Sequence, residues 1–175
     1  MQPLIYDVAV SADGFIAGAS GDVSLFPHDG PVVADYQARL QTYAAVVMGR
    51  TTYEFGYDFG LVPGQNPYPW AQTLVVSKTI DLPADAAVEK VFHDPLTRID
   101  QLREMAAGPV YLCGGGLLAG WLFHQRRITH LRLKRAPILL GQGVTLFDGH
   151  GMAQTMTLTD HKVYDSGVIY CEYTL

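Results

Sequence analysis

Glycine, hydroxyl and basic residues gather at three points where a predicted strand ends. The most glycine-rich point is Gly114, Gly115 and Gly116, between the apolar runs Val110–Cys113 and Leu117–Phe123. A helix that begins after such a turn presents free N–H groups and the positive end of its dipole, and both attract phosphate. Close packing of a strand against a helix also favours glycine. The triple glycine alone therefore leaves both interpretations open.

The other two points are Gly49-Arg50-Thr51-Thr52 and Ser77-Lys78. Because ligands of open α/β sheets bind outside the carboxyl ends of the strands, we expect all three turns to face one site. Two glycine turns can hold a pyrophosphate, and the hydroxyl and ammonium groups of Ser77 and Lys78 suit a third phosphate. A 2′-phosphate is the natural candidate, which favours NADPH over NADH. Each turn alone could be ordinary turn chemistry, but the three together favour a dinucleotide site.

The surrounding pattern predicts one α/β domain over residues 1–175. Apolar β-type runs alternate with helical periodicity through the first two thirds of the chain. The period then changes to two, with Leu131 and Leu133 alternating with charged residues, and segments 156–164 and 168–175 form a C-terminal hairpin. We expect a central, mostly parallel mixed sheet with this antiparallel hairpin and flanking helices on both faces.

Composition indicates a soluble globular protein. Of the 175 residues, 49% are hydrophobic and 17% are charged, and the net charge of −5 argues against a nucleic-acid partner. The adjacent basic pairs Arg126-Arg127 and Lys134-Arg135 are expected to be solvated ends of helices and strands. No signal peptide and no apolar run of membrane-spanning length is evident, so a cytoplasmic protein with no membrane partner is expected.

The cysteines and histidines predict no special chemistry. Cys113 and Cys171 lie in apolar runs and are expected to be small buried residues rather than a disulfide framework. None of the six histidines has the spacing of a metal ligand, so no metal site is predicted.

Five segments of the sequence occur together, in the same order, in one known family. They are SADGFIAG at 11–18, VVMGRTTYE at 46–54, LVVSK at 74–78, YLCGGGLLAGWL at 111–122 and LKRAPILLGQGVTLF at 133–147. Together they are spread over most of the chain, from residue 11 to residue 147. They resemble the dihydrofolate reductase superfamily, specifically the bacterial branch grouped with the C-terminal reductase domain of the riboflavin-biosynthesis deaminase/reductase (RibD).

This resemblance implies a dihydrofolate reductase-like three-layer fold with NADPH bound across the carboxyl ends of the strands. Ala9, Ile16 and Ala17 would lie beside the nicotinamide, with residues 13–18 in a mobile loop over it. The implied phosphate-binding positions are Gly49, Arg50, Thr51, Thr52, Gly114, Gly115, Gly116, Leu117 and Leu118, with Ser77 and Lys78 at the adenosine 2′-phosphate.

The sequence suggests fewer residues for binding the hydride acceptor. Folate reductases carry a carboxylate on their first helix that supports protonation of the pterin, and Asp35 on the predicted first helix is the candidate catalytic group here. From the sequence, Asp35 could face the pocket or the solvent. Four aromatic residues after the second strand could stack on a flat heterocycle or pack a long loop. They are Tyr57, Phe59, Tyr68 and Trp70.

We therefore predict an NADPH-dependent reductase that transfers a hydride to a small heterocycle. The acceptor would be pterin- or dihydrofolate-like, or similar to the 5-amino-6-ribosylaminopyrimidine of riboflavin biosynthesis. The alternative is a non-catalytic nucleotide-binding protein on a reductase scaffold. Related reductase domains are commonly dimers, and the alternating residues of the C-terminal hairpin could bury a dimer face, so a homodimer is expected.

Overall fold

A computed structural model of the protein describes residues 1–149 and 151–175. The strands in this part of the chain are β1 (Leu4–Ser11), β2 (Phe15–Ala17), β3 (Ala45–Gly49), β4 (Gln72–Val76), β5 (Glu89–Val91), β6 (Val110–Leu112), β7 (His130–Ala136), β8 (Val144–Thr145), β9 (Thr157–Val163) and β10 (Ile169–Thr174). The helices are α1 (Pro31–Leu40), α2 (Arg50–Phe55), α3 (Pro95–Met105) and α4 (Gly116–His124), with short 3₁₀ turns η1 (Ala19–Gly21) and η2 (Gly56–Phe59).

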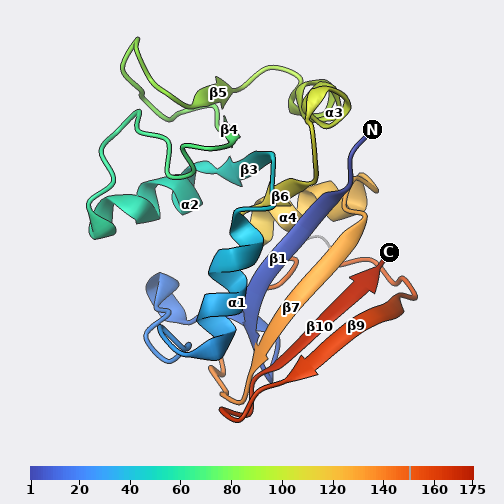
Figure 1. Ribbon diagram of the computed structural model, residues 1–175. Helices are drawn as coiled ribbons and strands as arrows, with labels where there is room; N and C mark the ends of the chain where they lie inside the picture. The colour runs from blue at the N-terminus through green and yellow to red at the C-terminus, as the bar shows by residue number, and fades with distance from the viewer. Residues whose placement is uncertain (150) are drawn as a thin grey trace.

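The described strands form one eight-stranded mixed sheet and one small ribbon. The order across the large sheet is β5-β4-β3-β6-β1-β7-β10-β9, and β2 pairs with β8 separately. Every neighbouring pair from β5 to β7 is parallel, whereas β10 runs antiparallel to both β7 and β9 (Figure 1). This confirms the expected mostly parallel sheet with an antiparallel C-terminal hairpin.

Helices cover both faces of the large sheet. Leu4 and Tyr6 of β1 belong to the core cluster that includes buried residues of α3 and α4, whereas Ile5 belongs to the cluster on the side of α1 and α2. This division follows from the alternation of side chains along a strand. In Figure 1, α1 lies in front of β1 and α4 lies behind it. The predicted three-layer arrangement is therefore confirmed.

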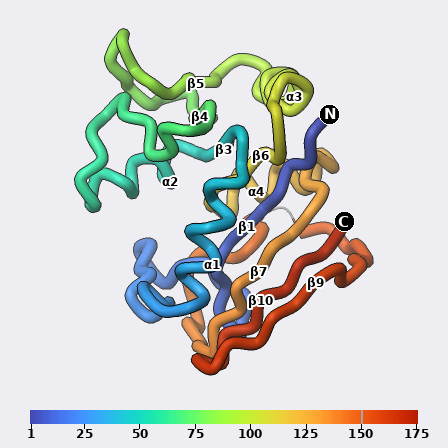
Figure 2. The backbone as a smooth tube through the Cα atoms, in the orientation of Figure 1, coloured from blue at the N-terminus to red at the C-terminus, as the bar shows by residue number. Residues whose placement is uncertain are grey.

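The C-terminal hairpin leaves one sheet edge open to solvent. All seven residues of β9 are exposed, and β9 lies at the end of the strand order beyond β10. Figure 2 shows the hairpin at one side of the molecule and β5 at the other. The unpaired edge of β9 is consistent with a strand that could pair with another chain, and the homodimer stays a prediction.

The pairing of β1 with β7 places two charged residues on one face of the sheet. Asp7 lies opposite Arg132, and Ala9 lies opposite Lys134. Because residues two apart in a strand share a face, Asp7 and Lys134 both point to the side of α1. Lys134 is only 7% exposed, so the expectation that it is solvated at a strand end is wrong. The neighbouring Arg135 points to the opposite side and is exposed, as expected.

Candidate functional site

Two cavities adjoin at the carboxyl ends of the parallel strands in the described part of the chain. The larger, of about 500 Å³, lies between the turns that follow β3 and β6. The smaller, of about 340 Å³, lies between β1, β7 and α1. Val8 and Gly114 line both cavities, so a molecule in one would contact a molecule in the other. After the roles that the sequence predicts for their residues, we call the larger the cofactor cavity and the smaller the acceptor cavity.

The structure brings together most of the residues that the sequence assigned to cofactor binding. Those that line the cofactor cavity are Ile16, Ala17, Gly49, Arg50, Thr51, Thr52, Gly114, Gly115, Gly116, Leu117 and Leu118. They come from the β2 segment and from the two strand-to-helix turns that precede α2 and α4. Residues far apart in the sequence therefore line one cavity, as predicted for the turns after β3 and β6.

The geometry of the two turns fits an anionic ligand. Neither α2 nor α4 has a side-chain cap at its N-terminus, so the first N–H groups of both helices lack that partner. Gly114 and Gly115 have φ values of 57° and 79°, which glycine adopts without strain. A Cβ atom on Gly115 would lie 3.0 Å from Thr52 Oγ1, so the two turns pack closely together. With the exposed guanidinium of Arg50 at the rim, these donors match the chemistry of a pyrophosphate.

Ser77 and Lys78 follow β4 but do not line the cofactor cavity. Val76, the last residue of β4, does line it, and it pairs with Gly49 of β3. The Ser77 hydroxyl accepts hydrogen bonds from the backbone N–H groups of Thr79 and Ile80 at 3.1 and 2.9 Å. Ser77 therefore forms the turn. Lys78 is exposed and lines neither cavity, and its contact with a 2′-phosphate stays a prediction.

Ala9 lines the acceptor cavity rather than the cofactor cavity. It lies one residue beyond Val8, which forms the common wall. A position beside the junction is compatible with the predicted contact to a nicotinamide, because that ring must reach the boundary between the two cavities to meet an acceptor.

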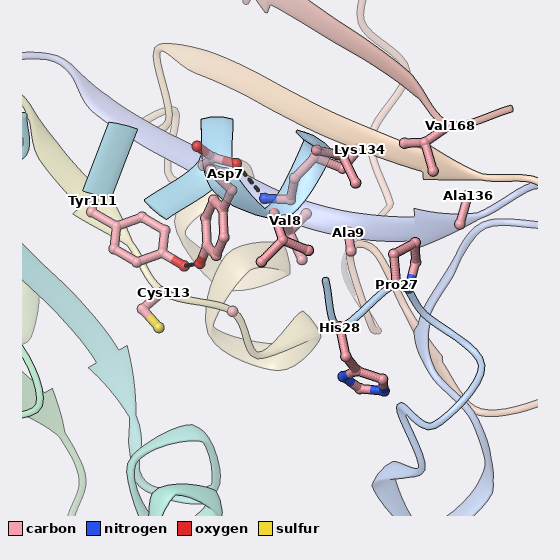
Figure 3. A pocket seen from close by; sticks show the side chains of 14 residues that line it. Asp7, Val8, Ala9, Pro27, His28, Tyr111, Cys113, Lys134, Ala136 and Val168 are labelled. Carbon is pink, nitrogen blue, oxygen red and sulfur yellow. Dashed lines mark hydrogen bonds and ion pairs between the residues drawn. The ribbon is translucent and has the colours of Figure 1, made fainter. Parts of the chain in front are cut away.

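A buried charge cluster forms one wall of the acceptor cavity, and the sequence analysis did not identify it. Asp7 Oδ1 accepts a hydrogen bond from Lys134 Nζ at 2.5 Å (Figure 3). Asp7 Oδ2 accepts hydrogen bonds from Arg39 Nε and the Tyr43 hydroxyl at 3.1 Å each. Asp7 and Lys134 line the cavity. The sequence does contain one signal of this cluster, which is the position of Asp7 inside an apolar strand. A carboxylate at such a position is rarely buried unless it is paired, so a positively charged partner could have been expected.

The charged groups of this cluster change one another's pKa values. Burial alone would raise the pKa of Asp7, but the positive charges of Lys134 and Arg39 outweigh it and hold that pKa below its usual value. Burial lowers the pKa of Lys134 by more than the neighbouring Asp7 carboxylate raises it. Arg39 also lies over the Tyr170 ring, with its guanidinium carbon 4.5 Å from the ring centroid. The cluster thus couples β1, α1, β7 and β10.

Asp35 does not line either cavity, which corrects its assignment as the catalytic group. Its Oδ2 atom accepts hydrogen bonds from Lys162 Nζ at 2.6 Å and from the Tyr164 hydroxyl at 2.8 Å. These hydrogen bonds lower the pKa of Asp35, and the side chain is 41% exposed. Asp35 precedes Tyr36 on α1, and because consecutive helix residues point about 100° apart, Tyr36 faces the acceptor cavity while Asp35 faces β9.

Replacing Asp35 by asparagine is therefore expected to leave cofactor affinity unchanged within about twofold, because the side chain contacts no cavity residue that the ligand would touch. Titration calorimetry with NADPH on the wild type and on Asp35→Asn measures this. A loss of more than tenfold would return Asp35 to the functional site.

The aromatic residues after β3 pack the loop rather than the site. Tyr57 and Tyr68 join the core cluster on the α1 side, and Phe59 and Trp70 are exposed. None of the four lines either cavity. The Tyr68 hydroxyl lies 3.2 Å from Cys113 Sγ, and Cys113 in turn lines the acceptor cavity. Of the two interpretations, the structure supports packing.

Neither a cluster of metal ligands nor a membrane-spanning helix occurs among the described residues. No group of three or more His, Cys, Asp or Glu residues there could hold a metal ion. Among the same residues, no helix is both long and apolar enough to cross a membrane.

The chain belongs to the RibD C-terminal domain family, whose sequence profile matches residues 2–170. It is 22% identical to the uncharacterized protein YyaP of Bacillus subtilis (strain 168), over 97% of this chain and 93% of that protein. Its fold is similar to the crystal structure of a putative riboflavin biosynthesis protein from Shewanella sp. PV-4, with a TM-score of 0.81, 23% identity, and coverage of 99% and 98% of the two chains. It is also similar to dihydrofolate reductase from Enterococcus faecalis complexed with NADP(H), with a TM-score of 0.69, 17% identity, and coverage of 98% and 95%. The fold is therefore dihydrofolate reductase-like.

Proposed function

We propose that this protein is an NADPH-dependent reductase that transfers a hydride to a small conjugated heterocycle. The observation that carries the proposal is the junction of the two cavities at Val8 and Gly114. Hydride transfer requires a donor ring and an acceptor within van der Waals distance, and adjoining cavities with a common wall allow that contact. The family match and the NADP(H) complex of the similar Enterococcus faecalis enzyme support the choice of cofactor.

The residues of the chain would bind and orient the two reactants. NADPH, when bound, supplies the hydride. The N-terminus of α4 and the Arg50 guanidinium would bind the pyrophosphate, and Lys78 would bind the 2′-phosphate. Ile16 and Ala17, which line the cofactor cavity, would pack against the nicotinamide and orient it toward Val8. The apolar side chains of the acceptor cavity would exclude water from the reacting atoms.

The acceptor is proposed to be a flat heterocycle of the pterin or ribosylaminopyrimidine type. The name of the similar Shewanella structure refers to riboflavin biosynthesis, and this supports a pyrimidine-derived ring. A cavity of about 340 Å³ is large enough for one such ring system.

Titration calorimetry with NADPH and, separately, with NADH tests the cofactor assignment. We expect NADPH to bind with a Kd of about 1 μM, and NADH to bind at least about tenfold more weakly because it lacks the 2′-phosphate. Lys78→Ala should reduce this difference, while Lys162→Ala, which removes an ammonium near α1 and far from β4, should not. Absence of binding by either nucleotide would refute the proposal. NADPH binding without oxidation across a panel of pterins and aminopyrimidines would favour the non-catalytic alternative.

A further inference from the structure

The carboxylate of the acceptor cavity has a protein partner at each oxygen and is not accessible to a ligand. Asp7 Oδ1 is occupied by Lys134, and Asp7 Oδ2 is occupied by Arg39 and Tyr43. The Asp7 side chain is 0% exposed. Among the described residues that line this cavity, Asp7 is the sole carboxylate. A ligand that presents paired N–H donors, such as an amidine or a diaminopyrimidine, would therefore find no carboxylate to accept them.

Lys134, in contrast, retains a hydrogen-bond donor. An ammonium group has three N–H donors. One points to Asp7 Oδ1, and the face of the Tyr36 ring, whose centroid lies 3.7 Å from Nζ, can accept a second as a cation–π contact. The third remains for a molecule in the cavity that Lys134 lines. Figure 3 shows Lys134 extending from β7 across to Asp7 on β1 at the wall of this cavity.

The remaining walls favour an uncharged occupant. Apolar side chains from β1, α1, β7 and the turn before β10 line the cavity, namely Val8, Val32, Val33, Ala136 and Val168. The Tyr36 and Tyr111 hydroxyls are 2.6 Å apart and hydrogen-bond to each other. An ionised group such as phosphate needs several donors to replace its water. The exposed His28 also lines the cavity, but one imidazole and an ammonium already paired with Asp7 do not provide them.

We propose that the acceptor cavity binds an uncharged conjugated carbonyl compound with its carbonyl oxygen hydrogen-bonded to Lys134. The proposal rests on the reductase function and narrows it. It specifies that the compound reduced presents a hydrogen-bond acceptor, and not a donor, to the wall of the cavity. The cavity selects for hydrogen-bond acceptors, and Lys134 is the residue that determines this specificity.

The same contact assists the reduction. When a hydride adds to a carbon conjugated with the carbonyl group, the displaced π electron pair moves to the carbonyl oxygen. Asp7, Lys134 and Arg39 together carry one excess positive charge, which stabilises the developing negative charge. One proton from Lys134 or from solvent then completes the product, so NADPH and one proton are consumed for each acceptor, and NADP⁺ is released.

Two pteridines distinguish a ligand that presents hydrogen-bond acceptors from one that presents donors. Lumazine (2,4-dioxopteridine) and 2,4-diaminopteridine share one ring system and differ by replacing carbonyl acceptors with amino donors. With the wild-type protein saturated with NADP⁺, calorimetry is expected to show lumazine binding at least about tenfold more tightly, because the diamino compound presents amino donors to Lys134 where lumazine presents carbonyl oxygens. Equal or tighter binding of the diamino compound would overturn the proposal, as would failure of lumazine to bind a protein that binds NADP⁺. Failure of NADP⁺ to bind would instead refute the reductase function itself.

Substitution of Lys134 tests whether this residue causes the preference for lumazine. Lys134→Met keeps the length of the side chain and removes its donors, so lumazine affinity should fall at least about tenfold while the affinity for 2,4-diaminopteridine does not fall. Lys162→Met is the matched control, since Lys162 pairs with Asp35 outside both cavities, and it should change neither affinity. Equal loss of both ligands in a folded Lys134→Met protein would contradict the specificity role. If this variant does not fold, the comparison of probes on the wild type still decides the proposal.

Discussion

Replacing Asp7 by alanine is expected to lower the free energy of unfolding by about 3–5 kcal/mol. The substitution leaves the Lys134 ammonium and the Arg39 guanidinium without their shared carboxylate, and both are largely buried. It also leaves the Tyr43 hydroxyl without its acceptor. Urea unfolding at neutral pH, followed by tryptophan fluorescence, measures the change.

The control for this prediction is Asp160→Ala. Asp160 lies on the exposed strand β9, and its carboxylate accepts a hydrogen bond only from the backbone N–H of His161 among the described contacts. Its loss should change stability by no more than about 0.5 kcal/mol. A decrease below about 1 kcal/mol for Asp7→Ala would show that the cluster contributes little to folding.

The same cluster predicts how stability depends on pH. Burial opposes ionisation of Asp7, but Lys134 and Arg39 prevail, so the pKa in the folded state lies below the unfolded value of about 3.9. The stabilisation by Asp7 is therefore fully present above about pH 4 and is lost as the pH falls through the folded-state pKa. In Asp7→Asn, which cannot ionise, stability should decrease less steeply below pH 4 than in the wild type.

Replacing Gly116 by alanine is expected to weaken NADPH binding by at least about 100-fold, or about 2.7 kcal/mol. A Cβ atom on Gly116 would lie 2.3 Å from the backbone carbonyl oxygen of Thr145 and 3.0 Å from Asp148 Cβ. The carbonyl belongs to β8 and cannot rotate away as a side chain could, so the start of α4 must move. Displacement of a binding group by about 1 Å is enough for an effect of this size.

The matched control is Gly108→Ala, followed by the same NADPH calorimetry and by urea unfolding. A Cβ atom on Gly108 would meet Ala44 Cβ at 3.6 Å, an ordinary contact, and Gly108 lines neither cavity. NADPH affinity should stay within about twofold of the wild type. A folded Gly116→Ala protein that binds NADPH within threefold of the wild type would contradict the assignment of α4 to the pyrophosphate.

The cofactor side of the site could be predicted from sequence because its signals are local. Gly114–Gly116 and Gly49–Thr52 each combine a strand end, a glycine turn and a helix start within a few residues, and parallel pairing then brings such turns to one edge. The same locality allowed the C-terminal hairpin to be predicted, because a period of two and a turn are visible in a short window.

The acceptor side could not be predicted in this way. The ion pair of Asp7 with Lys134 joins residues 127 positions apart, and it depends on the register of β1 with β7. The sequence shows Lys134 only as half of a basic pair beside Arg135, and the alternation of side chains puts the two on opposite faces. For Asp35 the sequence suggested a site residue that the structure places elsewhere. Its neighbour Tyr36 on α1 faces the cavity, whereas the Asp35 carboxylate points to Lys162 and Tyr164.

The two cavities draw their walls from different parts of the chain. The cofactor cavity is built mainly from the turns after β3 and β6, whereas α1, β7 and the turn before β10 contribute to the acceptor cavity alone. Substitutions at Val33, Ala136 or Val168 can therefore reshape the acceptor cavity while the phosphate-binding turns keep their geometry. Such a division would allow acceptor specificity to diverge between related proteins while the proposed cofactor site stays the same.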